Sequence, residues 1–340
     1  MERKLGATAV LFAFVLLVIH AVNPIAAYID SVKTGNAGVR KTAGAAAPNS
    51  GRQEFRSWQE RISHEAANLR IEPIDAKIDP IWKAVPGYNG IEVDIDKTLQ
   101  LALERPLSDS IPFVYREVRP AVELDDLPPA PVYRGNPHKP MTALMFHVAW
   151  GDEYLPELLD ALKEADVRAT FFLSGGWLAK HREMAARIAA EGHELSNRGY
   201  SAGTMSGLSR AQIYEEISET EKMLEELGVK NKWFSPPYGD YDERMVRIAH
   251  GMGLRTVLWT LDAQDWKTPD PQRIISNVRD RLEPGTLVLL HPTEAALKAL
   301  PEIVEIARQK GLAAGTVGET LASSRVPGKP GGAVERKAEF

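Results

Sequence analysis

Strand-like and helix-like segments alternate through most of the second half of this 340-residue chain. The intervening segments carry apolar residues at the three-to-four spacing of a helix, as in YLPELLDALKEA. Repeated strand–helix units with apolar strands form a parallel sheet covered by helices. The pattern predicts an α/β fold in which about seven parallel strands close into an irregular (β/α) barrel. The expected strands are Thr142–Ala149, Arg168–Leu173, His193–Asn197, Lys232–Ser235, Arg255–Trp259, Thr286–His291 and Leu312–Thr316.

The amino terminus has the pattern of an export signal. Arg3 and Lys4 precede an apolar run from Leu5 to Ile19. Basic residues before such a run keep the amino end in the cytoplasm and direct the following chain across the membrane. We expect residues 1–30 to be a signal peptide or a signal anchor, and the sequence leaves both open. The rest of the chain is then exported, to the outer face of the cytoplasmic membrane or to the cell wall.

The remaining chain divides by composition. Residues 31–57 are rich in Gly, Ala, Ser and Lys without an apolar period and predict a flexible linker, and residues 324–340 predict a flexible tail. Residues 58–137 combine an extended piece, a PGYNG turn, a short strand and a helix entered at Asp96. They are expected to form a small α+β module ahead of a barrel domain at 141–323.

Charge and cysteine content exclude several functions. Lys and Arg total 41 against 46 Asp and Glu, which gives a formal net charge of −5. No basic excess is available for phosphates, so we do not expect nucleic acid as a partner. The chain has no cysteine, which excludes disulfides and thiolate metal sites, so any metal would need His, Asp or Glu ligands.

Five segments carry a family resemblance. They are ALMFHVAWGDEYLPELLDALKEADVRATFFLSGGWL, AAEGHELSNRGYS, WFSPPYGDYDERM, GLRTVLWTLDAQDWK and GTLVLLHPT, and they occur in this order. Together they resemble the motifs of the polysaccharide deacetylase family, the NodB homology domain. The AWGDEY variant is most similar to a sporulation-associated subgroup of spore-forming Gram-positive bacteria. This resemblance implies an exported barrel protein whose partner is a cell-wall glycan such as peptidoglycan, with the forespore or spore envelope as a location.

The resemblance also implies a chemistry. Enzymes of this family remove acetyl groups from N-acetylated sugars with a divalent metal, usually zinc. A metal held by two His and one Asp lowers the pKa of its bound water. An Asp then acts as general base, an Arg orients that Asp, and a late His tuned by another Asp acts as general acid.

Several catalytic positions of the family are replaced in this sequence. The base position falls on His147, and the arginine that would orient the base is replaced by Ser235. The late acid is kept as His291, and the acids that would tune it are Asp262 and Asp265. The resemblance therefore retains the acid side of the mechanism and loses the base side.

The metal positions are also replaced. The two histidine positions fall on Arg198 and Ala202, and the carboxylate position falls on Val148 or, across a longer turn, on Asp152. A guanidinium carries a fixed positive charge that repels a dication. Hydrolysis by the usual metal route is therefore not expected, and no cofactor is expected unless zinc or another divalent metal has an alternative site.

Two functions stay open. In one, the chain is an amidohydrolase of N-acetylated glycans, with His147 as base, His291 as acid and Arg198 as oxyanion stabiliser. A rebuilt metal site would then use His147, Asp152 and His291, an acceptable zinc set by ligand type. In the other, which we favour, the chain binds glycan without catalysis.

Aromatic and proline residues in the motif loops are the candidates for sugar contact, because sugars stack on aromatic faces. These candidates are Trp150, Pro236, Pro237, Tyr238 and Trp266. The module at 58–137 has a P-G-x-x-G-x-x-V-D pattern that resembles peptidoglycan-binding modules of wall proteins. A spacer without binding function fits the same residues equally well.

Overall fold

The computed structural model describes residues 48–201 and 203–326. The chain separates into two compact units, Met1–Phe55 and Arg56–Phe340. The expected signal segment lies outside the described residues, as does most of the expected linker and tail. Within the described ranges, no helix combines the length and apolar character needed to cross a membrane.

The first described element is a helix, and it corrects the expected linker. Helix α3 spans Pro48–Asn68, so residues 48–57 are helical and not a loose tether. Residues in its second turn such as Gln53 and Glu54 are good helix formers, and they favour a helix at this position. Trp58 and Ile62 lie one turn apart and are both fully buried.

The region after α3 consists of short antiparallel strands and one helix. Strand β3 pairs with β4 and strand β1 pairs with β2, both antiparallel. The side chain of Asp94 accepts a hydrogen bond from the Lys97 amide and caps α4, so the helix begins just before the expected Asp96. The elements are β1 Lys77–Asp79, β2 Lys83–Val85, β3 Gly90–Val93, α4 Ile95–Ala102, β4 Tyr115–Val118 and the 3-10 turn η1 Leu124–Asp126.

The following domain is built on a parallel sheet, which confirms the predicted fold class. Its strands follow the order β10-β11-β5-β6-β7-β8-β9, and β12 also pairs with β5. Every pairing between these strands is parallel. The strands are β5 Met141–Val148, β6 Thr170–Leu173, β7 Glu194–Asn197, β8 Trp233–Phe234, β9 Arg255–Thr256, β10 Leu261–Asp262, β11 Leu287–Leu290 and β12 Ala313–Gly315.

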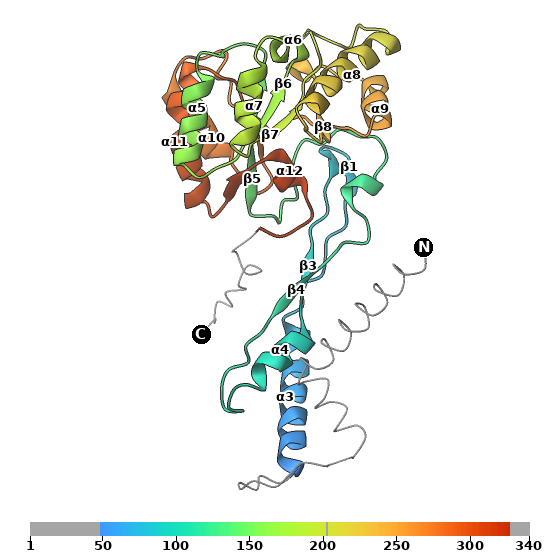
Figure 1. The fold of residues 1–340 in the computed structure, drawn as a ribbon, viewed down its shortest axis with the longest axis vertical. Coiled ribbons are helices and arrows are strands. Elements are labelled where there is room, and N and C mark those ends of the chain that lie inside the picture. The colour runs from blue at the N-terminus through green and yellow to red at the C-terminus, as the bar shows by residue number, and fades with distance from the viewer. Residues whose placement is uncertain (1–47, 202, 327–340) are drawn as a thin grey trace, which may run out of the picture. The chain divides into compact units, whose positions relative to one another are not determined.

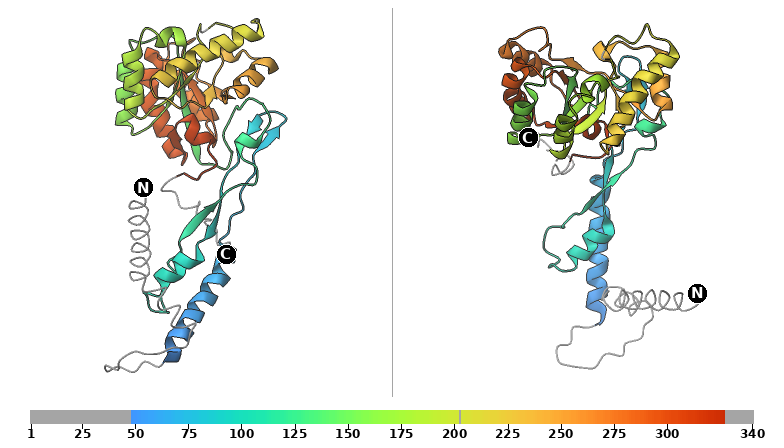
Figure 2. Two further views of the ribbon diagram at one scale, coloured as in Figure 1. Left: turned by 45° about the vertical axis from the view of Figure 1, so that its right-hand side comes forward. Right: turned by 45° about the horizontal axis from the view of Figure 1, so that its top comes forward.

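Helices cover the outside of this curled sheet (Figure 1), and Figure 2 shows the strands enclosed by them. Helix α11 packs against both α5 and α10. The helices are α5 Leu155–Glu164, α6 Gly175–Leu178, α7 Arg182–Ala190, α8 Arg210–Glu226, α9 Glu243–Gly251, α10 Pro271–Arg281, α11 Glu294–Gln309 and α12 Val317–Leu321, with a 3-10 turn η2 at Pro237–Gly239.

Strand β5 shows how the two faces of the sheet differ. Leu144, Phe146 and Val148 join the core cluster that contains the outer helices. Ala143 and Met145 join a second cluster formed by the inner faces of the strands. Successive side chains of a strand alternate between its two faces. The next side chain on the inner face of β5 is therefore the one two positions after Met145.

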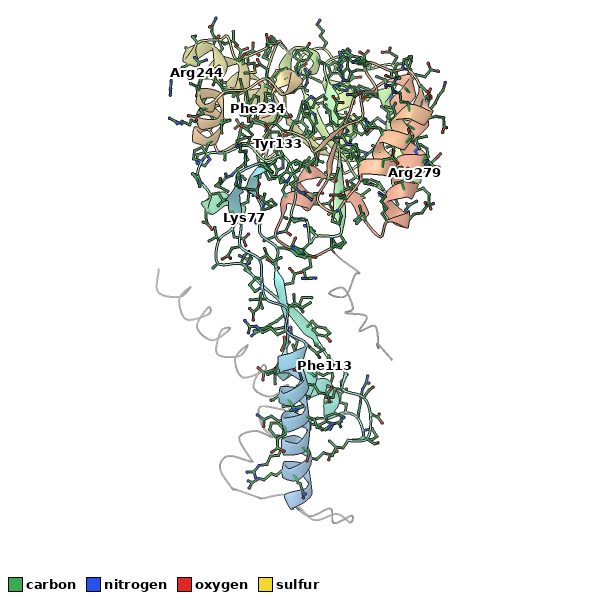
Figure 3. All side chains as sticks on the ribbon, turned by 180° about the vertical axis from the view of Figure 1, so that it is seen from behind. Lys77, Phe113, Tyr133, Phe234, Arg244 and Arg279 are labelled. Atoms are coloured by element: carbon green, nitrogen blue, oxygen red, sulfur yellow. The ribbon has the colours of Figure 1, made fainter. Side chains whose placement is uncertain are left out.

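A segment from the preceding module closes the barrel. Strands β9 and β10 lie at opposite edges of the sheet. Between them, Val132 bridges to Val257 and Arg134 bridges to Thr286. Tyr133, labelled in Figure 3, accepts a hydrogen bond from Thr260 Oγ1 through its carbonyl at 2.6 Å. The barrel therefore closes through this extended segment, a contribution that the sequence did not predict.

The strand boundaries also need one correction. The expected strand Arg255–Trp259 pairs with β8 only over Arg255–Thr256, and Val257 turns to Val132. An additional short strand, β10 at Leu261–Asp262, pairs with β11. Two residues are too few to produce a periodic sequence signal, so β10 was missed.

Candidate functional site

Strand alternation brings the polar motif residues to one place. His147 lies on the inner face of β5, and Arg198, Ser235 and His291 directly follow β7, β8 and β11. Each continues the inner-facing positions of its strand. Because the carboxyl ends of parallel strands meet at one edge, these side chains gather at that edge of the barrel.

His147 lies at the centre of this group and is 2% exposed. Its Nε2 is 2.8 Å from Ser235 Oγ, so the two share a hydrogen bond. Its ring meets those of Phe172, Trp259 and His291 edge-on, with centroids 5.5 to 5.9 Å apart. The imidazole is thus enclosed by rings and held by one hydroxyl.

His147 is expected to make stability depend on pH. Burial, and then the charges of Arg198 and His291, lower its pKa well below the usual value of 6.5. In the unfolded chain the same histidine takes up a proton below about pH 6.5, which the folded state resists. Its contribution to stability is therefore complete above that pH and declines as the pH falls below it.

The measurement is the free energy of unfolding in urea between about pH 5 and pH 8. His147→Gln should reduce the slope by up to about 1.4 kcal/mol per pH unit in the acid part of that range. His138→Gln, at an exposed position, is the matched control and should leave the slope unchanged. An identical slope for wild type and His147→Gln would contradict a neutral, buried His147.

His291 is held by Asp265. The Oδ1 atom of this carboxylate is 3.1 Å from His291 Nδ1, and its Oδ2 accepts the His291 amide at 2.8 Å. Thr293 Oγ1 donates a further hydrogen bond to Oδ2 at 3.1 Å. On the solvent side, the Trp150 ring stacks on His291 with centroids 5.9 Å apart and planes 3° apart. One buried carboxylate therefore positions the imidazole and, through it, an aromatic side chain.

Asp262 does not share this role. Its Oδ1 accepts the backbone amide of Gln264 at 2.8 Å, and its carbonyl accepts Asn277 Nδ2. Of the two acids that the sequence suggested for His291, Asp265 is the one in contact. Asp262 caps a turn.

Arg198 carries a buried charge that forms no ion pair with the described residues 48–201 and 203–326. It is 4% exposed, and its Nε and Nη1 are buried with no hydrogen-bond partner in the described part of the chain. Its Cζ lies 5.9 Å from the centre of the Tyr238 ring. Burial lowers the pKa of the guanidinium to about 10, which keeps it protonated at neutral pH. The second expected ligand position, Ala202, lies outside the described residues.

The residues present do not fit a zinc ion. Among residues 48–201 and 203–326, no group of three or more His, Cys, Asp or Glu side chains could hold a metal. The alternative set of His147, Asp152 and His291 does not form, because Asp152 Oδ2 lies 3.6 Å from His181 Nε2 instead. Arg198 adds a positive charge beside His147, and this charge would repel a dication bound there.

The expected sugar-contact residues differ in exposure. Trp150, Tyr238 and Trp266 are 46%, 71% and 56% exposed. Pro236 and Pro237 are buried, and their contact with a substrate stays a prediction. They precede Tyr238, which has a φ of 59°. This angle lies in the left-handed region, which residues other than glycine rarely adopt.

Three contacts of the site were not anticipated. Trp259 meets the His147 ring, Ser235 bonds its Nε2, and Thr293 supports Asp265. Ser235 was noted only as a missing arginine. The signal that could have found it is its place directly after an expected strand, next to the edge that His147 shares.

A sizeable cavity lies away from this site. It has a volume of about 860 Å³ and is lined by residues at the starts of β7, β8 and β9, among them Glu194, Trp233 and Arg255. Since those are the amino ends of the strands, this cavity is at the opposite end of the barrel from His147.

Fold and site together define a (β/α)-barrel protein with a polar cluster at the strand ends, flanked by exposed aromatic residues. A family profile for polysaccharide deacetylases matches residues 134–257. The uncharacterized protein YlxY of Bacillus subtilis is 37% identical over 268 residues, which covers 78% of this chain and 84% of that protein. This chain belongs to the polysaccharide deacetylase family.

Two further relatives bear on the site. A peptidoglycan-N-acetylglucosamine deacetylase of Bacillus cereus is 32% identical over 185 residues, covering 53% of this chain and 67% of that one. The crystal structure of BA3943 of Bacillus anthracis, described as a CE4 family pseudoenzyme, aligns with a TM-score of 0.71 and 38% identity over 79% of this chain and 96% of that one. A mutant of BA3943 described as having restored enzymatic activity aligns with a TM-score of 0.72.

Proposed function

We propose that this protein binds N-acetylated cell-wall glycan of the peptidoglycan type without hydrolysing it by the metal route of its family. We further propose that it acts after export, at the outer face of the cytoplasmic membrane or in the cell wall. The basic residues before the apolar run at the amino terminus support that location.

The observation that carries this proposal is the buried guanidinium of Arg198. Its positive charge acts on His147, the residue at the family's base position, and contributes to the lowered pKa of that histidine. A dication beside it would meet strong repulsion in a site with little water. An arginine also cannot supply hydroxide at neutral pH, because it does not give up its proton there. The pseudoenzyme description of BA3943, at 38% identity, supports the same conclusion.

Exposed aromatic side chains supply a means of binding. Trp150 is positioned by its stack on His291, and Tyr238 lies over Arg198. Sugar rings stack on such faces while polar groups fix their orientation. Both side chains come from loops that follow strands of the barrel, so a glycan at this edge would meet them together.

A hydrolase is the second candidate, and the His291–Asp265 pair favours it. This pair retains the arrangement expected of a general acid. His147 is the weaker half of the mechanism, because an imidazole whose pKa is well below 6.5 is a poor base. Its Nε2 is also engaged by Ser235.

Glycan binding should depend on the exposed aromatic residues. Tyr238→Ala and Trp150→Ala in the full-length chain should each weaken retention on purified peptidoglycan by about 3- to 10-fold, as expected for the loss of one stacked ring. Tyr214→Ala, at an exposed tyrosine of α8, is the matched control and should bind like wild type.

Two assays on the same full-length protein distinguish glycan binding from hydrolysis. Metal content and acetate release from peptidoglycan and acetylated chito-oligomers are measured with and without added zinc. We expect neither bound metal nor acetate. Stoichiometric metal with acetate release that a chelator abolishes would establish the hydrolase and reject the binding-only function.

A further inference from the structure

The unpaired Arg198 points to a specific ligand chemistry. The buried side chain keeps two guanidinium nitrogens without a hydrogen-bond partner among the described residues. Burying a charge and its donors without partners destabilises a folded protein. Such a group is retained where a ligand completes its hydrogen bonds, and an arginine fork matches a carboxylate or a phosphate.

The groups around Arg198 leave its guanidinium available to an anionic ligand. The influence that opposes the burial of Arg198 comes from Tyr238, a phenol and not a carboxylate. The nearby carboxylate of Asp265 is occupied by His291 and Thr293. His147 is enclosed by rings and bonded to Ser235. The cluster thus holds one positive charge that no side chain of the described protein neutralises.

The single charge favours a carboxylate over a phosphate. A phosphate carries nearly two charges and three acceptor oxygens at neutral pH, and it requires several donors or cations. Arg198 offers one planar cation, and His147 beside it is kept neutral by burial. The Cζ atom of Arg198 lies 5.9 Å from the centre of the Tyr238 ring. A sugar stacked on this exposed ring would therefore place its substituents near the guanidinium.

We propose that Arg198 binds a carboxylate carried by the glycan, so that the preferred ligand is an acidic amino sugar, such as one with a lactyl ether, and not a neutral N-acetylated chain. This inference rests on the proposed glycan binding and adds its selectivity. Arg198, at a position where the family resemblance implies a metal ligand, would then bind an anion.

The test compares two ligands of the same shape. One is a tetrasaccharide of alternating N-acetylglucosamine and N-acetylmuramic acid with free lactyl carboxylates, and the other is its methyl ester. Calorimetric titration of the full-length protein should show the acid binding about 10- to 100-fold more tightly than the ester, the range for hydrogen bonds to a charged group. Sodium acetate is titrated separately to separate a free carboxylate from one carried on sugar.

Variants assign the preference to Arg198. Arg198→Met removes the charge at similar volume and should reduce the acid-to-ester ratio to about one. Arg198→Lys keeps the charge without the planar fork and should give an intermediate acid-to-ester ratio. This variant tests the carboxylate preference if Arg198→Met does not fold. Arg247→Met, at an exposed ion pair on α9, is the control and should retain the wild-type ratio.

The outcomes separate this inference from the function it rests on. Equal binding of acid and ester by wild type overturns the carboxylate site and leaves glycan binding intact. The same follows if folded Arg198→Met keeps the preference. Acetate binding as tight as the tetrasaccharide overturns recognition of a sugar-borne carboxylate. Binding of neither oligosaccharide rejects glycan binding itself and this inference with it.

Discussion

Replacing Asp265 with alanine is expected to lower the free energy of unfolding by about 3 to 5 kcal/mol, the range for breaking a buried charged pair. The carboxylate accepts from the His291 amide and the Thr293 hydroxyl, and it holds His291 Nδ1. Each buried donor left without a partner costs about 1 to 3 kcal/mol. The cost of these unpaired donors is part of the total expected loss.

The effect should also reach the glycan site. His291 supports the stacked Trp150 ring, so Asp265→Ala should weaken peptidoglycan retention even under conditions in which the variant is fully folded. Asp265→Asn keeps one acceptor oxygen and the side-chain shape, and it should recover part of the stability. Urea unfolding and the retention assay are the two measurements.

The matched control is Asp262→Ala. This carboxylate caps a turn through one amide hydrogen bond and lies outside the His291 network. Its loss should cost at most about 1 kcal/mol. A loss of stability for Asp265→Ala no larger than that for Asp262→Ala would show that the buried network does not stabilise the fold.

Gly151→Ala is the second substitution with a large expected effect, a loss of about 3 kcal/mol or more in the free energy of unfolding. Gly151 has a φ of +79°, and a Cβ there would stand 2.1 Å from the Pro292 carbonyl oxygen. An alanine therefore adds left-handed strain and forces the Trp150 turn away from the segment after His291. Intrinsic fluorescence should report the altered Trp150–His291 stack.

Gly253→Ala isolates the steric part of that effect. Gly253 has a φ of +80°, nearly that of Gly151, and a Cβ there would meet nothing within 4 Å. It should cost only the conformational penalty of about 1 to 2 kcal/mol. Equal costs for the two substitutions would mean that the two loops around the site are not in close contact.

Much of the fold was accessible from sequence because burial imposes a period. The helix after Tyr154 repeats apolar residues at the spacing that its geometry requires, and the strand that contains His147 is a continuous apolar run, as expected of a strand buried on both faces. The period of apolar residues gave no signal for elements too short to contain a repeat, such as β10 at Leu261–Asp262. Composition misled at residues 48–57, where small residues suggested a loop but the segment joins a helix.

The site was predicted in its members and not in its contacts. The family resemblance assigned His147, Arg198 and His291 to motif positions of one site, and alternation along the strands places all three on the inner face. The choice of Asp265 over Asp262, and of Ser235 as the partner of His147, depends on where a turn directs a side chain. Asp152 shows the same limit, since its turn carries it toward His181 and away from the proposed metal set.

The sequence by itself determined the barrel, the family and the loss of the usual ligand types, because these follow from periodicity and from residue identity along the chain. Only the tertiary structure decided that two nitrogens of the buried Arg198 lack a hydrogen-bond partner among the described residues, and that the segment around Tyr133 closes the barrel. Burial and pairing are properties of residues distant in sequence, and they are settled only when the strands that carry them meet.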